Sequence, residues 1–171
     1  ELSNTDKLSE FFEELKRLDI KVQRPCINKC FAEFIPEENI LYYALGAIKN
    51  VGAEAISHII AEREKNGKFK SMSDFINRIN PKDINKLQLE GLVKAGAFDS
   101  IFSNRKVLYN NIPNIIQNSK TMYENKIQNQ KSLFGDENQK ISYLISENNS
   151  SSWSSDEVLS KEFESVGFYI S

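Results

Sequence analysis

The sequence predicts a mainly α-helical fold with a small β element near the N-terminus and a flexible C-terminal linker. Apolar residues recur at helical spacing in several segments, and each segment is bounded by a capping residue, a glycine or a proline. Short runs of aromatic and β-branched residues at 31–34 and 40–43 predict strands. Residues 135–155 are rich in Ser, Asn and Glu and lack apolar periodicity, which is typical of a mobile linker.

The N-terminal part combines one helix with short extended segments. Residues 5–19 have helical apolar spacing, and residues 20–22 are extended. Residues 31–34 and 40–43 are expected to pair as a hairpin across the Pro-Glu-Glu-Asn sequence at 36–39. The apolar face of the helix is expected in the core, through Phe11, Phe12, Leu15 and Leu18.

Helices dominate the rest of the chain, and local residues mark their ends. Ser71 and Asp74 form a capping-box pattern, Gly96 is a typical C-terminal cap, and Pro113 predicts a break or kink. A strand is expected to start near Gly167. The predicted helices cover residues 53–65, 71–79, 85–95, 104–129 and 156–166.

Charge is distributed unevenly along the chain. The net charge of the 171 residues is −2, so no global basic field indicates a nucleic-acid partner. Residues 45–106, however, carry 11 Lys and Arg against 7 Asp and Glu, a local charge of +4 that leaves −6 on the flanks. A basic run around Gly67 is expected to be a solvated helix end, with Arg63, Lys65, Lys68 and Lys70.

Composition also limits the expected class of protein. Cys26, Cys30 and His58 are the only cysteines and histidine, too few for a four-ligand zinc site, so we expect two free thiols and no metal site. No apolar run is long enough to span a membrane and no signal peptide is visible, so we expect a cytoplasmic protein without a membrane partner. The first residue is not methionine, which suggests a piece of a longer protein.

The first functional motif is a tight turn within residues 44–60, ALGAIKNVGAEAISHII. A turn that leads into a helix presents unpaired backbone N–H groups at the positive end of the helix dipole, which favours phosphate. Gly52 permits close approach of the backbone, and Asn50 tolerates positive φ. The pattern is typical of a helix-hairpin-helix motif that binds the DNA backbone, although an ordinary helix start is the alternative. Residues 48–52 are called the first turn. The residues expected to contact DNA there, including the first residue after the turn, are Lys49, Asn50, Val51, Gly52 and Ala53.

A second turn, residues 94–98, repeats the pattern within LEGLVKAGAFDS. Two such hairpins would straddle a duplex and bind its phosphates without reading the sequence, in a salt-sensitive way. A plain helix C-cap at Gly96 is the alternative. The expected contacts here are Lys94, Ala95, Gly96, Ala97, Asn104 and Arg105.

Six segments in order carry a resemblance that extends over nearly the whole chain: RPCINKCFAEF, ALGAIKNVGAEAI, GKFKSMSDFINRI, NKLQLEGLVKAGAFDSI, QKSLFGD and EFESVGFYIS. Together they resemble the bacterial DNA polymerase III alpha subunits, the family C replicative polymerases. Cys26, Cys30 and Asn50 depart from the residues more usual in that family. The resemblance implies four regions: the end of the fingers domain at 1–39, the tandem helix-hairpin-helix region at 40–110, a long helix with a sliding-clamp-binding motif at 111–135, and a linker leading to an OB-fold domain at 136–171.

The clamp-binding motif is the sequence QKSLF, which fits the pattern Gln-x-x-Leu-Phe. A short extended peptide of this kind offers a glutamine for hydrogen bonds and two apolar anchors for a pocket. The alternative is that the two anchors fold back onto the preceding helix. The motif consists of Gln130, Lys131, Ser132, Leu133 and Phe134.

The resemblance implies that the parent chain is a DNA-directed DNA polymerase, a nucleotidyltransferase whose palm carboxylates bind two magnesium ions outside this segment. We therefore expect no catalytic residue, metal or cofactor in this chain, which would be inactive alone. Its expected partners are double-stranded or primer-template DNA, the sliding clamp and other replicase subunits, and its expected role is to support processive synthesis. Two alternatives stay open: a DNA glycosylase that uses Asp74, and a replisome interaction adaptor whose hairpins are only structural.

Overall fold

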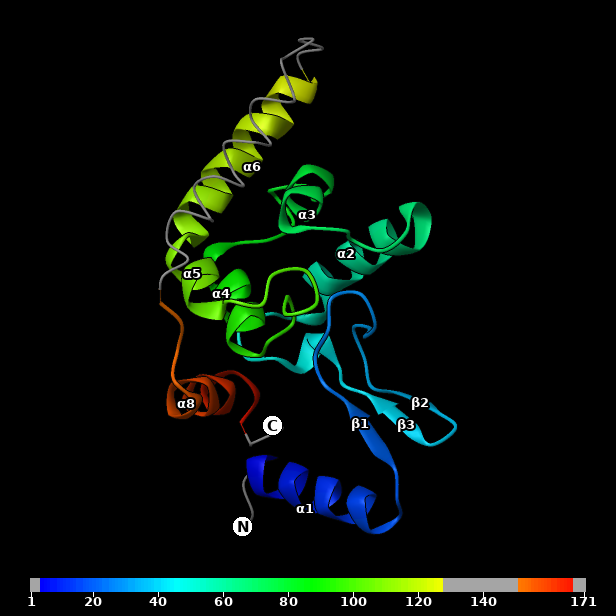
Figure 1. The fold of residues 1–171 in the computed structure, drawn as a ribbon. Helices are drawn as coiled ribbons and strands as arrows, with labels where there is room; N and C mark the ends of the chain where they lie inside the picture. The colour runs from blue at the N-terminus through cyan, green and yellow to red at the C-terminus, as the bar shows by residue number, and fades with distance from the viewer. Residues whose placement is uncertain (1–3, 128–150, 168–171) are drawn as a thin grey trace.

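Helices account for most of the chain in the computed structural model, which describes residues 4–127 and 151–167 (Figure 1). The predicted mainly α fold with a small N-terminal β element is confirmed. Most of the expected linker, and the strand expected after Gly167, lie outside the described residues. The helices are α1 (Asn4–Arg17), α2 (Ala53–Asn66), α3 (Met72–Arg78), α4 (Lys86–Lys94), α5 (Arg105–Asn110), α6 (Ile112–Ile127) and α8 (Ser155–Val166), with the 3-10 helix η1 (Leu45–Ala47).

Polar capping residues begin several helices, and the one at Ser71 was predicted. The Ser71 side chain accepts a hydrogen bond from the Asp74 backbone N–H at 3.0 Å. Asn85 and Gln88 form a complete capping box at the start of α4, with the Gln88 N–H donating to Asn85 at 2.9 Å. Ser154 begins α8 with the same motif. These bonds satisfy N–H groups that have no partner inside the helix.

The long helix predicted over residues 104–129 is two helices, and the break differs slightly from the predicted one. The chain leaves the helical conformation at Asn111, whose ψ is 4°. Pro113 lies in the first turn of α6, where its missing N–H removes no helical hydrogen bond. The proline therefore starts a helix instead of breaking one.

A three-stranded sheet lies beside the helices, in the order β1-β3-β2 (Figure 1). Strand β1 (Lys21–Gln23) is parallel to β3 (Ile40–Tyr42), and β2 (Ile35–Glu37) is antiparallel to β3. The hairpin was predicted, but its first strand was placed too early at residues 31–34. The backbone carbonyl of Phe31 instead accepts from the Leu45 N–H of η1 at 2.8 Å, so that segment supports the helical region.

Only half of the expected apolar face of α1 is buried. Phe12 and Leu15 are each 8% exposed, and Phe12 stacks on Tyr43 with 6.2 Å between ring centroids. Phe11 and Leu18 are 49% and 57% exposed, so their predicted place in the core is wrong. Helix α1 lies at one end of the molecule and packs next to β1, which leaves most of its circumference uncovered (Figure 1).

Arg63 connects α2 to the N-terminal loop. Its side chain is 5% exposed, and its Nη1 donates to the carbonyl oxygens of Ile27 at 2.9 Å and Cys30 at 2.6 Å. The guanidinium also lies 4.9 Å from the ring centroid of Phe31, within cation–π range. The solvated position predicted for Arg63 is therefore wrong, because two buried carbonyls require its donors. The other members of the basic run are exposed, as expected: Lys65, Lys68 and Lys70.

Both thiols are free, as predicted, and the structure places both in the buried part of the chain. The Cys30 Sγ donates to the Arg24 carbonyl oxygen at 3.2 Å, and burial raises the pKa of this thiol to about 11. Within residues 4–127 and 151–167, no helix has the length and apolar content needed to cross a membrane.

Candidate nucleic-acid interface

The first turn connects η1 to α2 through two residues with left-handed backbone. Asn50 has φ of +70° and Gly52 has φ of +78°. The positive φ expected of Asn50 is therefore present. Val51 is 2% exposed and anchors the turn in the core, while Lys49 and Asn50 are exposed. The turn thus exposes its polar residues and buries its apolar one.

Helix α4 fixes the shape of this turn from behind. A Cβ added at Gly91 would lie 2.7 Å from the Lys49 carbonyl oxygen and 3.1 Å from Val51 Cγ2, so the helix backbone contacts the turn directly. The Gln88 side chain adds a hydrogen bond from Nε2 to the Val51 carbonyl oxygen at 3.0 Å. The turn is therefore held by a neighbouring helix as well as by its own residues.

A polar hollow of about 470 Å³ lies at the N-terminus of α2. Gly52 is the N-cap and provides no side-chain hydrogen bond, so the first N–H groups of α2 face this hollow without a side-chain cap. A Cβ added at Gly52 would have no heavy atom within 4 Å. The lining residues are Val51, Gly52, Ala53, Glu54, Ala55, His58, Lys82, Asp83, Asn85 and Gln88.

The charges around this hollow are mixed. Lys82 is exposed at its rim and Lys49 is exposed on the adjoining turn, whereas Glu54 and Asp83 contribute negative charge. The start of α4 at Asn85 reaches the same hollow, so two helix N-termini meet there. Sequence reasoning missed Lys82 and the second helix start, although the polar Asn-Pro-Lys-Asp turn before α4 was a usable signal. The arrangement can receive an anion such as phosphate.

The second turn has a different geometry. Ala95 and Ala97 are 4% and 0% exposed, and Gly96 is also buried. The Gly96 N–H donates to the Val93 carbonyl oxygen at 3.0 Å, and the Ala97 N–H donates to that of Leu92 at 2.9 Å. This pair of bonds is a Schellman motif, which closes the end of α4. The backbone amides of these three residues point inward to the helix end.

Arg105 covers the second turn. A Cβ added at Gly96 would lie 2.7 Å from the Arg105 Cζ, so the guanidinium packs on the glycine backbone. Arg105 donates from Nη2 to Asp99 Oδ2 at 2.7 Å and from Nη1 to Glu162 Oε1 at 3.0 Å. Burial alone would lower the pKa of Arg105, but its bonds to Asp99 and Glu162 outweigh burial and raise the pKa.

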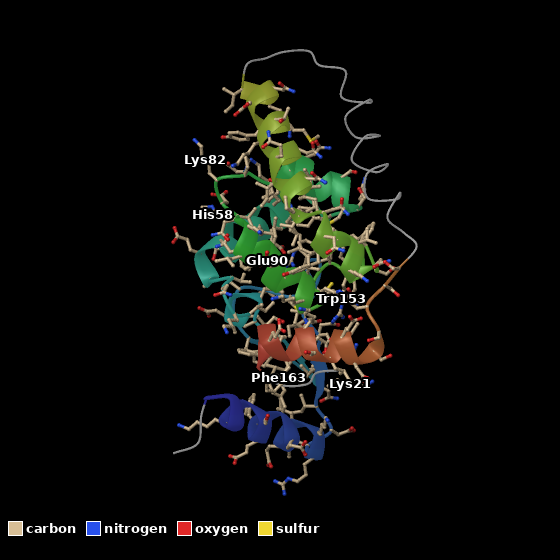
Figure 2. All side chains as sticks on the ribbon, turned by 90° about the vertical axis from the view of Figure 1, so that its left-hand side faces the viewer. Lys21, His58, Lys82, Glu90, Trp153 and Phe163 are labelled. Atoms are coloured by element: carbon tan, nitrogen blue, oxygen red, sulfur yellow. The ribbon has the colours of Figure 1, made fainter. Side chains whose placement is uncertain are left out.

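Lys94 and Asn104 are also engaged within the chain. The Lys94 Nζ lies 3.2 Å from Glu164 Oε2 of α8 and 5.7 Å from the ring centroid of Tyr109. Asn104 caps α5 and donates from Nδ2 to the Ser151 carbonyl oxygen at 3.0 Å. Helix α8 packs against α4, on which Glu90 is labelled (Figure 2). The two turns thus differ, since the first is open and the second is covered.

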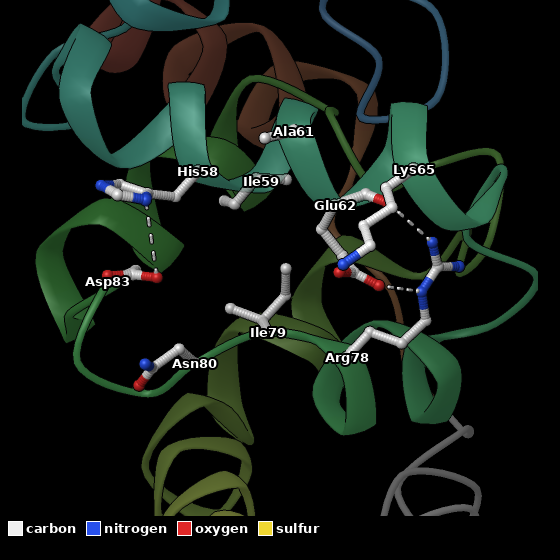
Figure 3. Close-up of a pocket in the computed structure, with 9 residues that line it drawn as sticks. All are labelled: His58, Ile59, Ala61, Glu62, Lys65, Arg78, Ile79, Asn80 and Asp83. Carbon is white, nitrogen blue, oxygen red and sulfur yellow. Dashed lines mark hydrogen bonds and ion pairs between the residues drawn. The ribbon is translucent and has the colours of Figure 1, made fainter.

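A separate polar hollow of about 270 Å³ lies between α2 and the α3 segment (Figure 3). On one side His58 Nδ1 is 4.0 Å from Asp83 Oδ2, and on the other Arg78 Nε donates to Glu62 Oε1 at 3.0 Å. Burial alone would raise the pKa of Glu62, but the hydrogen bond from Arg78 outweighs burial and lowers this pKa. Because Arg78 also bonds to three backbone carbonyls, its charge holds the α2–α3 connection together.

Neither a catalytic aspartate nor a metal cluster is evident among the described residues. The Asp74 Oδ2 accepts from the Lys70 N–H at 2.9 Å and from Arg78 Nη1 at 3.0 Å, which is a capping and bridging role. Within residues 4–127 and 151–167, no group of three or more His, Cys, Asp or Glu side chains is arranged to hold a metal ion. The expected clamp-binding motif, residues 130–134, lies outside the described part of the chain.

Known proteins resemble this chain at two levels. The helix-hairpin-helix motif family matches residues 19–108. DNA polymerase III subunit alpha of Borreliella burgdorferi is 41% identical over 173 aligned residues, which include 100% of this chain and 15% of the relative. The protein of the same name from Caulobacter vibrioides is 37% identical over 99% of this chain, again 15% of the relative.

A third relative with that name, from Campylobacter jejuni, is 40% identical over 80% of this chain and 12% of its own length. The chain thus spans about 15% of the length of the first two relatives. The chain therefore belongs to the helix-hairpin-helix family and corresponds, over its whole length, to a segment of DNA polymerase III subunit alpha.

Proposed function

We propose that this chain is the duplex-binding and clamp-tethering segment of a replicative DNA polymerase III alpha subunit. The observation that carries the DNA-binding part is the uncapped N-terminus of α2, which faces an open hollow beside exposed lysines. A phosphate group there would accept hydrogen bonds from the first N–H groups of α2 and would be attracted by its dipole. Lys49 and Lys82 would add charge at the rim.

Binding of this kind is independent of base sequence, because backbone amides and lysines contact phosphates and not base edges. It is also salt-dependent, because each neutralised phosphate releases counterions. Glu54 and Asp83 beside the hollow limit the attraction. We therefore expect the chain to position a duplex without selecting it, as a processive polymerase requires.

The remaining parts of the proposal rest on the resemblance and on the names of the relatives. Residues 130–134 would tether the polymerase to the sliding clamp, with Leu133 and Phe134 as apolar anchors. The parent protein would be a cytoplasmic DNA-directed DNA polymerase that acts with other replicase subunits. The described residues of this chain do not offer a carboxylate cluster for magnesium, so we assign no step of nucleotidyl transfer to them.

The DNA-binding proposal is tested by fluorescence anisotropy of a labelled blunt duplex at several salt concentrations. We expect Kd to rise steeply with salt, and we expect Lys49→Gln to weaken binding and to reduce the salt slope by about one. Lys120→Gln on the exposed side of α6 is the matched control, because it removes the same charge away from the hollow. Equal effects of the two substitutions would rule out a specific contact at the first turn.

The clamp proposal has its own test and its own alternative. Surface plasmon resonance on an immobilised bacterial sliding clamp should detect this chain, and the double substitution Leu133→Ala, Phe134→Ala should abolish the signal while duplex binding persists. A replisome adaptor with purely structural hairpins would show the opposite pattern, with protein partners retained and no salt-dependent duplex binding.

A further inference from the structure

We infer that the second turn is the docking site of α8 and that the duplex is bound by the first turn alone. The claim about the duplex rests on the proposed function, whereas docking of α8 is supported by contacts within the chain. The two turns follow a similar sequence pattern, but their surroundings in the fold differ.

The backbone amides of the second turn are already bonded. Those of Ala95, Gly96 and Ala97 donate to carbonyls of α4, and that of Asp99 donates to the Gly96 carbonyl oxygen at 3.1 Å. These bonds close the end of α4 and do not involve α8, so they would persist without α8. A phosphate approaching this turn would find no uncapped helix start like the one at Gly52.

The cations of the second turn face carboxylates of α8. Arg105 is paired with Glu162, whose side chain is 2% exposed, and Lys94 is paired with Glu164. Helix α8 carries four acidic residues and one lysine, so its net charge of −3 complements a basic surface. The carboxylates therefore occupy the positions in which phosphate oxygens would have to pair with these cations.

Aromatic and backbone contacts complete the docking. The ring centroid of Trp153, which is labelled in Figure 2, lies 5.6 Å from that of Tyr109 in α5. The Lys161 Nζ lies 5.8 Å from the Trp153 ring centroid. At the other end of α8, the Ser165 carbonyl oxygen accepts from the Lys49 N–H at 2.8 Å. Helix α8 is thus held at both ends, and its last turn supports the first turn directly.

Docking is measured through Trp153, the only tryptophan of the chain. Lys94→Glu places two carboxylates together, so acrylamide quenching of Trp153 should increase at least twofold. Glu164→Lys alone should do the same by opposing Lys94 and Lys161, and the double substitution should return quenching toward the wild-type value because it restores the pair between positions 94 and 164. Lys120→Glu is the control for net charge and should leave quenching unchanged. Unchanged quenching in both single variants, or failure of the pair to restore it, would overturn docking at this site.

Fluorescence anisotropy of a labelled duplex tests whether the first turn alone binds DNA. Lys94→Gln should raise Kd no more than Lys120→Gln does, whereas Lys49→Gln should raise it several-fold. A Lys94→Gln effect as large as that of Lys49→Gln, with a lower salt slope and unchanged Trp153 quenching, would overturn the inference. If the wild-type chain binds no duplex at all, the proposed DNA-binding function fails, and the quenching series still decides whether α8 docks on the second turn.

Discussion

The backbone of Gly91 lies directly against the carbonyl oxygen of Lys49, at a distance that leaves no room for a Cβ. Glycine inside a helix costs roughly 1 kcal/mol relative to alanine, so a helical glycine usually has a packing reason. Here the reason is the first turn, which α4 supports from behind. Helix α4 and the first turn are therefore one structural unit, although Lys49 and Gly91 are 42 positions apart in the sequence.

Gly91→Ala tests that unit. The added Cβ would lie 2.7 Å from the Lys49 carbonyl oxygen, so we expect the variant to be destabilised by about 1–3 kcal/mol despite its better helix propensity. Duplex binding should weaken together with stability, because the turn must shift. Urea denaturation measures the first effect and anisotropy the second. An increase in the free energy of unfolding would show that the turn can accommodate a Cβ at position 91 beside the Lys49 carbonyl oxygen.

Gly52→Ala tests the approach of the DNA backbone, and Gly67→Ala is its matched control. Both glycines flank α2, both have positive φ (+78° and +88°), and neither has a heavy atom within 4 Å of an added Cβ. We expect both substitutions to cost about 1 kcal/mol of stability through backbone strain. The Gly52 variant alone should also lose duplex affinity, because its methyl group occupies the hollow. Equal duplex affinities would contradict the proposed phosphate site.

Arg78→Lys should be strongly destabilising for a conservative change. The Arg78 guanidinium pairs with Glu62 and Asp74, each at 3.0 Å, and lies 4.4 Å from the Phe69 ring centroid. An ammonium group cannot reproduce this planar set of contacts, so we expect a loss of roughly 2 kcal/mol. Thermal unfolding of Arg78→Lys, beside Lys65→Arg at the exposed end of α2, measures the difference. Similar melting temperatures for the two variants would contradict this role.

Stability should fall at alkaline pH because of Cys30. Burial raises its pKa from the ordinary value of 9.0 to about 11 in the folded chain. The unfolded state therefore releases its proton first, and the stabilisation present below pH 9.0 is lost as pH rises toward 11, by at most about 1.4 kcal/mol per pH unit.

Cys30→Ala should flatten this dependence in urea titrations between pH 9.0 and about 11, the window set by the two pKa values. Cys26→Ala, which keeps the Cys30 thiol, should preserve most of the slope. A steep slope in the absence of Cys30 would assign the alkaline transition to another group. Tyr43 is the first to consider, since burial raises its pKa to about 12.

The helical part of the fold was predictable because its information is local. Asn85, Ser71 and the Gly67 cap mark helix ends through hydrogen bonds between residues a few positions apart. The positive φ of Asn50 was also predictable, because few residue types adopt it. Strand β2 was misplaced because a strand of three residues carries little periodicity.

The surroundings of the second turn were not predictable, because they depend on contacts over long sequence separations. Arg105 and Glu162 are 57 residues apart, and nothing local to either residue indicates the other. The same holds for Arg63, whose acceptor at Ile27 is 36 residues away. A basic residue in a polar run is usually solvated, and only the fold reveals a buried carbonyl that needs its donor.

The bridge from Arg63 to Ile27 and Cys30 has a consequence for how this region can be moved between proteins. A graft that began at residue 40 would separate two paired strands and leave the buried guanidinium of α2 without two of its acceptors. Recombination at that point would thus transfer a destabilised region. The loss of stability would be about 3 kcal/mol or more if the Arg63 guanidinium stays buried. A graft that begins before Cys26 keeps the bridge intact, so the loop at residues 26–31 and helix α2 should be exchanged together as a cassette.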